Sequence, residues 1–326
     1  MKQKQQSSEQ PFIFEVVVRE DNRPYFVELN RPQTGKYKVD YYGRCDDPNC
    51  IFLKKRYCSN FKCFFKKAGV YRISLYGSFP GFNFYDFVWP IWIWNRIVWG
   101  CVDTVKEKQR TRDEFLEEYG YCYKIYLKNI IAWGTNKWRR MDNMFSECML
   151  MDMSATDAPD LRKIKSLNAM FKNCRYFNGN IGHWNVSNVK SMVDTFWKAY
   201  HYNMPLEQWD VSNVRYMDHM FAYALSFNQP LNRWNVSRTE FMEHMFMSAI
   251  SFNQPLDRWN VSHVKDMWGM FEGADDFTQS LDKWKVSSVR ENDCAYLGRG
   301  GFVKDDIEMV AVHGRIVKEK ASILED

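Results

Sequence analysis

The sequence lacks the features that would place it among enzymes or membrane proteins. It has no glycine-rich phosphate loop, no sharp turn that carries a nucleophilic serine and no paired catalytic carboxylates. Its first ten residues are polar, without the apolar run of a secretory signal. The stretch Phe82–Val102 is apolar, but Asp86, Pro90, Asn95 and Arg96 interrupt it too often for a membrane span. We therefore expect a non-enzymatic protein, made in the cytoplasm, with no small-molecule substrate.

Acidic residues are missing between Asp47 and Asp86, where basic and aromatic residues alternate. Such a stretch suits nucleic acid, an anionic membrane surface or the acidic face of another protein. It also fits a solvated strand face over a β-sheet core, which is the interpretation we favour. The candidate interaction residues are Lys54, Lys55, Arg56, Lys62, Lys66 and Lys67.

The chain has nine cysteines, an odd number that fits a reducing compartment better than a fully disulfide-bonded protein. Four of them form two pairs of equal spacing, namely Cys45, Cys50, Cys58 and Cys63. Four thiolates can hold zinc, but the spacing within each pair is wider than in the usual zinc knuckle. Zinc, disulfides and free structural thiols all stay open, and we expect no other cofactor.

What the sequence does have is a repeat of 25 residues. Five tryptophans keep this step without a slip: Trp184, Trp209, Trp234, Trp259 and Trp284. Methionines follow in register at Met192, Met217, Met242 and Met267, and phenylalanines at Phe196, Phe221, Phe246 and Phe271. A fixed period in this range indicates a solenoid, in which each unit buries its apolar face against the next unit. Weaker copies begin at Trp133, so we expect at least six coils.

Each repeat predicts a short strand followed by a short helix. Val186, Val189 and Met192 lie in a β-like run, whereas Met192, Phe196 and Ala199 have the spacing of one helical face. An asparagine column, Asn178, Asn203, Asn228 and Asn253, suits a ladder that satisfies backbone groups. His219 and His244 share a column and should stack; we interpret them as surface residues rather than metal ligands.

The residues before the repeats predict strands. Phe12, Phe14, Val16 and Val18 alternate with weaker positions, and Tyr37–Tyr42 and Val70–Tyr76 are also rich in β-formers. These runs suit an antiparallel β-sandwich. The expected fold class is α+β, a sandwich followed by a right-handed solenoid of short strands and helices. The expected segments are 1–10 (arm), 11–81 (sandwich), 82–128 (insertion), 129–290 (repeats) and 291–326 (cap, with a helix over Lys304–Glu325).

The repeats, with WNVSNVKSM and MFAYALSFNQPLNRWNVS, resemble the BspA-like surface-protein repeat, a family related to leucine-rich repeats. The preceding part is similar to the PKD-like domain that often accompanies them. The residues that carry this likeness are FIFEV at Phe12–Val16, YKVDYYG at Tyr37–Gly43, KKAGVYRISLYGSFP at Lys66–Pro80 and IIAWGTNKWRRMDNMFSEC at Ile130–Cys148. The resemblance implies a non-catalytic protein that binds other proteins.

Relative to that family, residues 82–128 are an insertion, with a helix expected from Thr111. Its aromatic residues, Trp89, Trp92, Trp94 and Trp99, either pack between the two domains, which we favour, or form an exposed interface.

Three functions fit these expectations. The first is a structural component of a large assembly, such as a virion or minor capsid protein, because the family also occurs in large DNA viruses. The second is a surface-displayed adhesin, and the third is binding of nucleic acid or an anionic surface. Asn185, Asn235 and Asn260 open Asn-Val-Ser sequons whose glycans we expect to collide with the stack, which argues against export.

Overall fold

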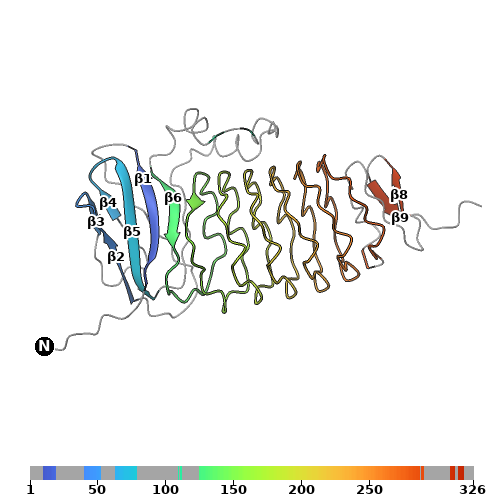
Figure 1. Ribbon diagram of the computed structural model, residues 1–326, viewed down its shortest axis with the longest axis horizontal. Coiled ribbons are helices and arrows are strands. Elements are labelled where there is room, and N and C mark those ends of the chain that lie inside the picture. Colours follow the sequence, from blue (N-terminus) through green and yellow to red (C-terminus); the bar gives the residue numbers. More distant parts are fainter. Residues whose placement is uncertain are drawn as a thin grey trace, which may run out of the picture.

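A computed structural model describes the parts of the chain on which the fold depends. The described residues are 10–19, 40–52, 63–78, 109, 111, 125–286, 288–289, 309–312 and 315–318. Figure 1 shows a β-sheet at the N-terminal end and a row of similar coils that extends away from it. Residues 133–289 of this row are called the coil stack below.

The N-terminal sheet has five strands in the order β2-β5-β1-β6-β7. Strand β1 lies at its centre and pairs antiparallel with β5 and β6, whereas β7 is parallel to β6. Phe12, Phe14, Val16 and Val18 of β1 are buried, as their alternation predicts. The strands are β1 (Phe12–Val18), β2 (Asp40–Cys45), β5 (Gly69–Ser78), β6 (Ile125–Ala132) and β7 (Asp152–Met153).

The expected β-sandwich is wrong. A sandwich needs two sheets packed face to face, but the described strands before the repeats form this single open sheet and a small ladder of β3 (Cys50–Phe52) with β4 (Cys63–Phe65). The helix expected over Lys304–Glu325 is also wrong for the part of that range that the structure describes. Strands β8 (Met309–Val312) and β9 (Arg315–Lys318) pair there antiparallel, at the far end of the coil stack (Figure 1).

The sheet and the coil stack share one hydrophobic core. The ring of Phe12 in β1 lies 5.6 Å from that of Trp133 and 5.3 Å from that of Trp138. Trp133 in turn meets Trp184 edge-on at 5.2 Å. Because β7 belongs to the first coils and pairs with β6, the sheet continues directly into the stack.

Backbone hydrogen bonds join each coil to the next. Parallel bridges connect Ser166, Ser191, Tyr216, Phe241 and Asp266 in series. Beyond this column, every second amide donates to the following coil, as in Asp194 N–H to the Asp218 carbonyl (2.9 Å) and Phe196 N–H to the Met220 carbonyl (2.9 Å). The coils therefore satisfy one another's backbone groups, as the strands of a sheet do.

The short helices expected within the repeats are wrong, and with them the α+β fold class. No helix occurs between residues 125 and 286. The segment from Met217 to Ala224 is a run of turns, in which the amides of Met220, Ala222 and Ala224 each donate to the carbonyl three residues earlier. The amides between them bond to the next coil instead. An α-helix needs all these donors for itself, so the two arrangements exclude each other.

Left-handed backbone conformations separate these turns. Two columns have positive φ in coil after coil. One contains Asn143, Ala169, Asp194, His219, His244 and Gly269; the other contains Glu147, Asn173, Lys198, Tyr223, Ser248 and Gly273. A left-handed residue ends a right-handed helical turn, which explains why no helix grows from the Met–Phe–Ala spacing.

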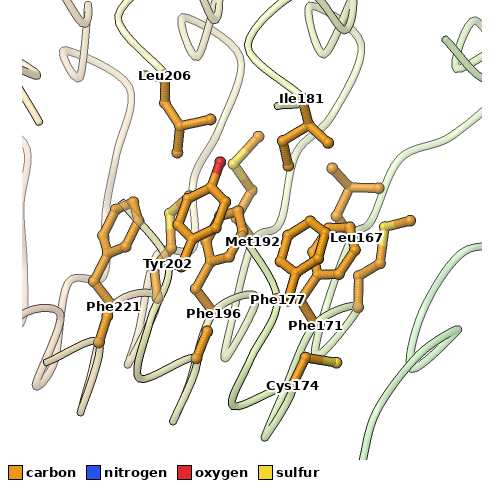
Figure 2. Close-up of a cluster of buried hydrophobic side chains, with 14 of the residues drawn as sticks. Leu167, Phe171, Cys174, Phe177, Ile181, Met192, Phe196, Tyr202, Leu206 and Phe221 are labelled. Atoms are coloured by element: carbon orange, nitrogen blue, oxygen red, sulfur yellow. The ribbon is translucent and has the colours of Figure 1, made fainter. Parts of the chain in front are cut away.

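The apolar columns fill the interior. Figure 2 shows Phe171, Phe196 and Phe221 in a row along the stack, with Ile181 and Leu206 facing them from the other side of their coils. The rings of Phe196 and Phe221 are stacked at 5.4 Å, nearly parallel. A second row, which includes Phe177 and Tyr202, stacks beside the first. The repeat columns predicted to form the core are thus buried as expected.

The tryptophan and asparagine columns also form hydrogen bonds to backbone groups of neighbouring coils. The indole Nε1 of Trp234 donates to the Leu206 carbonyl (2.9 Å), and three further tryptophans of that column make the same bond. Oδ1 of Asn203 accepts the amide hydrogen of Asn228 (2.9 Å), so the predicted asparagine ladder is confirmed. Trp184 is the exception, because its buried Nε1 has no hydrogen-bond partner.

Because Trp184 lacks this hydrogen bond, a comparison with Trp234 measures what the bond contributes to the free energy of unfolding. Trp234 and Trp184 are equally buried, at 3% exposure, so Trp234→Phe and Trp184→Phe remove similar apolar area. Only Trp234→Phe also removes a hydrogen bond, and we expect it to lower the free energy of unfolding by about 1 kcal/mol more than Trp184→Phe does. Urea denaturation followed by circular dichroism measures the difference. Equal losses would show that the indole bond contributes nothing.

The left-handed columns give a second stability prediction. Ser248 has φ 55° and is partly exposed. A β-branched side chain fits this conformation poorly, at a cost of about 1–2 kcal/mol, whereas glycine adopts it freely. We therefore expect Ser248→Val to unfold at lower urea than Ser248→Gly, which should stay close to the wild type. A valine variant as stable as the glycine variant would contradict the left-handed assignment.

Candidate functional site

The predicted basic patch lies only partly within the described residues. Lys66 and Lys67 are exposed in the turn between β4 and β5, and Arg72 is exposed on β5. Val70, beside them, is 52% exposed. Lys54, Lys55, Arg56 and Lys62 lie outside the described residues, as do Trp89, Trp92, Trp94 and Trp99. Binding of an anionic partner at this patch stays a prediction.

The sheet region brings two of the four clustered cysteines together. A hydrogen bond with the Cys50 thiol, and then burial, raises the pKa of the Cys45 thiol. Neither forms a disulfide. Cys63 lies in β4, where its neighbour in register is Phe52 of β3; Cys58 lies outside the described residues. A four-thiolate zinc site therefore also stays a prediction.

An exposed group of aromatic side chains, which we call the aromatic strip, lies on the coil stack. It consists of Tyr216 (40% exposed), Phe241 (partly exposed) and Trp268 (46% exposed). Each is adjacent in sequence to a buried methionine of its own coil, so its side chain points outward where the methionine points inward. The rings of Tyr216 and Phe241 stack at 5.4 Å. Three consecutive coils thus present large apolar side chains to solvent.

A charged column flanks the aromatic strip. The Arg215 guanidinium lies 3.1 Å from one oxygen of Glu240, and Lys265 Nζ lies 2.7 Å from the other. The hydrogen bond from Lys265 lowers the pKa of Glu240. Lys165 and Lys190 occupy the same column in earlier coils and are exposed. The strip therefore lies beside a mainly basic column with one acidic member.

The aromatic strip is not among the residues predicted from the sequence, although the sequence carries a signal for it. The column of Tyr216 and Phe241 holds serine in the two preceding coils, at Ser166 and Ser191. A change from small polar to large aromatic residues at an outward column indicates a surface feature rather than core packing.

Cationic side chains alternate with aromatic rings on another part of the stack. Lys172 Nζ lies 4.5 Å from the centre of the Trp197 ring, and Lys198 Nζ lies 4.4 Å from the same ring. Lys172 also pairs with Asp194 at 2.7 Å. Lys198 is only 4% exposed, and burial, followed by the charge of Arg175, lowers its pKa to about 8.

The histidine column stacks as predicted. The imidazole rings of His219 and His244 lie 5.1 Å apart and nearly parallel, on consecutive coils. Glu243 joins them in a group whose ligand atoms all lie within 4.8 Å of one another. These three are the described residues best placed to hold a metal ion. The interpretation of both histidines as surface residues is wrong for His244, which is buried.

The asparagines of the three sequons are exposed, so the expected collision of glycans with the stack is wrong. Asn185, Asn235 and Asn260 each follow a buried tryptophan and face solvent. Their side-chain oxygens accept the amide hydrogens of the serines two residues later, as in Ser187 to Asn185 (3.2 Å). The sequons therefore carry no argument against export.

A stack of coils with matching side-chain columns defines a repeat protein, whose coils offer their outward columns as a surface. This chain belongs to the family described as Mycoplasma protein of unknown function, DUF285, whose model matches residues 139–249 and 208–305, about half of the chain. Comparisons with curated proteins and with solved structures found no match. Within the described residues, no helix has the length and apolar character needed to cross a membrane.

The lowered pKa of Lys198 gives a pH prediction. Between about pH 8 and the ordinary lysine pKa near 10.5, the unfolded chain binds a proton at Lys198 that the folded chain does not. Folding stability should therefore rise with pH in this window, by about 1–3 kcal/mol. We expect the free energy of unfolding of the wild type to rise relative to that of Lys198→Met from pH 8 to pH 10. Parallel pH profiles for the two proteins would contradict the shift.

Proposed function

We propose that this protein is a non-catalytic interaction protein that binds another protein through the outward columns of its coil stack. The observation that carries the proposal is the exposed aromatic strip beside a basic column. Protein interfaces concentrate their binding energy in tyrosine, tryptophan and arginine, and within three consecutive coils this surface exposes Tyr216, Trp268 and the adjacent Arg215. The core of the stack serves to hold this surface in shape.

The rigidity of the surface supports the proposal. Tyr216 and Phe241 stand on adjacent backbone segments joined by a parallel bridge, and they stack on each other. Side chains that are already ordered lose less conformational entropy on binding, so more of the contact energy appears as affinity. Family membership supports the repeat character but assigns no partner.

The partner is proposed as a component of a large assembly. The repeat resembles that of BspA-like surface proteins, and a virion or minor capsid role follows from the occurrence of such repeats in large DNA viruses. A stack that grows by adding coils suits a structural wall. Recovery of the protein with purified particles would support this role, and its presence only as a soluble monomer would count heavily against it.

The aromatic strip can be tested directly. The triple variant Tyr216→Ser, Phe241→Ser, Trp268→Ser should lose association with the native partner at least tenfold, because each exposed ring removed costs about 1 kcal/mol or more of binding. The matched control is Asn185→Ser, Asn235→Ser, Asn260→Ser, which changes three exposed residues of another column. Affinity purification with quantitative mass spectrometry compares the two. Undiminished association in the aromatic variant would refute the proposed surface.

Display on a cell surface as an adhesin is a second candidate function. The exposed sequon asparagines favour it, because glycans at Asn185, Asn235 and Asn260 would extend into solvent. Protease added to intact cells would remove a displayed protein and spare an internal one. The outward columns would serve an adhesin and an assembly component alike.

A further inference from the structure

A cluster of histidine and carboxylate side chains spans four consecutive coils and contacts Trp268 of the aromatic strip. His219 and His244 occupy the same column of neighbouring coils, and Glu243 immediately precedes His244. Glu272 of the following coil lies with one oxygen 3.5 Å from His244 Nε2, and Asp194 of the preceding coil lies 3.7 Å from His219 Nδ1. Two imidazoles are thus surrounded by carboxylates that come from separate coils.

His244 is held in place more firmly than a surface histidine. Its exposure is 7%, and the centre of the Trp268 ring lies 4.4 Å from the centre of the imidazole, with the two rings nearly perpendicular. Glycine stands at the equivalent position of the next coil, where a Cβ on Gly269 would come within 2.4 Å of the imidazole. The stack therefore leaves room for this ring by omitting a side chain.

The buried Nδ1 of His244 lacks a hydrogen bond. Glu243 Oε1 lies 3.3 Å from this atom, but the approach does not have hydrogen-bond geometry. A buried polar nitrogen without a partner is rare in folded proteins, because burial removes its hydrogen bond to water and no protein group replaces that bond. Here the Glu243 carboxylate lies beside this atom and the His219 ring stacks on the same imidazole, so three potential metal ligands meet at one place.

We propose that His219, Glu243 and His244 bind a divalent transition metal, zinc in the first instance, which clamps consecutive coils together. Two imidazole nitrogens and one carboxylate oxygen form a recognised zinc ligand set. We assign Nδ1 of His244 as its ligand atom. Glu272, at Nε2 of the same ring, then takes the orienting role that carboxylates have behind metal-bound histidines.

The His219 and Glu243 side chains must turn toward His244 to bind the ion, because the two imidazole rings now stack nearly parallel. A tetrahedral zinc with ligands at about 2.0–2.1 Å brings those atoms to roughly 3.4 Å from one another, whereas they now lie within 4.8 Å. The side chains of His219 and Glu243 are 31% and 39% exposed and can turn toward His244, which stays fixed. The amide of Glu243 donates to Asp218 Oδ1 at 3.1 Å, which anchors its backbone to the preceding coil.

Metal titration of the full chain tests the proposal. After treatment with a chelator, the protein is titrated with zinc by calorimetry and with cobalt(II) by absorption spectroscopy. Cobalt bound to imidazole and carboxylate gives weak visible bands, whereas cobalt bound to cysteine thiolates adds intense near-ultraviolet bands. The cobalt spectrum therefore separates this site from the clustered cysteines. Zinc should also raise the Tm, because it binds only the folded arrangement.

The test variants are His219→Ala and Glu243→Gln, both at partly exposed side chains whose loss should leave the core intact. The control is His263→Ala, which removes an exposed histidine outside the cluster. Each test variant should bind the site's metal at least tenfold more weakly, because changes behind the ligands alone cost about 10–100-fold and these variants alter a ligand itself. The control should bind as the wild type does. Absence of a thiolate-free cobalt spectrum in the wild type, or unchanged affinity in both test variants, would overturn the proposal.

Discussion

The structure depends on hydrogen bonds that a single coil cannot make alone. In the segment after each buried methionine, alternate amides such as those of Asp194 and Phe196 donate to carbonyls of the next coil. In an isolated coil these amides would bond to water instead, and the apolar columns would be exposed, so the coil would gain too little to offset the conformational entropy of ordering its backbone. The coils are therefore stable only as a stack. The N-terminal sheet meets the same need at the first coil, where β6 pairs with β7.

This pairing also explains why the columns keep their residue types. Once neighbouring coils are fixed in register, each side chain lies against its own counterpart, so a residue that stacks well with itself suits every coil. Phenylalanine satisfies this condition by parallel ring stacking, as at Phe196 and Phe221. Asparagine satisfies it because Oδ1 of Asn203 accepts from the backbone of Asn228 in the next coil. Outward columns carry no such restriction, and Ser191, Tyr216 and Asp266 share one of them.

The sequence predicts the core of this molecule better than its backbone conformation. The columns of Trp, Met and Phe are buried as expected, because a strict period leaves one way to form a shared interior. The prediction of a short helix in each repeat is wrong because the spacing of Met192, Phe196 and Ala199 also fits a run of turns. The deciding left-handed positions are mostly occupied by residues other than glycine, such as Ala169 and Lys198, so they carry no turn signal. Only Gly269 and Gly273 hint at them.

In the sheet and in the candidate sites, too, the sequence pattern identifies single elements but not the neighbours that complete them. Alternation identified β1 but not its partners, and one of those partners, β6, belongs to a segment far along the chain. The period alone placed His219 beside His244, yet it could not show that Gly269 leaves the space in which His244 becomes buried. A repeat thus creates a cluster from residues 25 positions apart whenever two coils carry the same side chain. Whether such a cluster is a site depends on the coil that follows, because that coil decides whether the side chains stay in water or become enclosed.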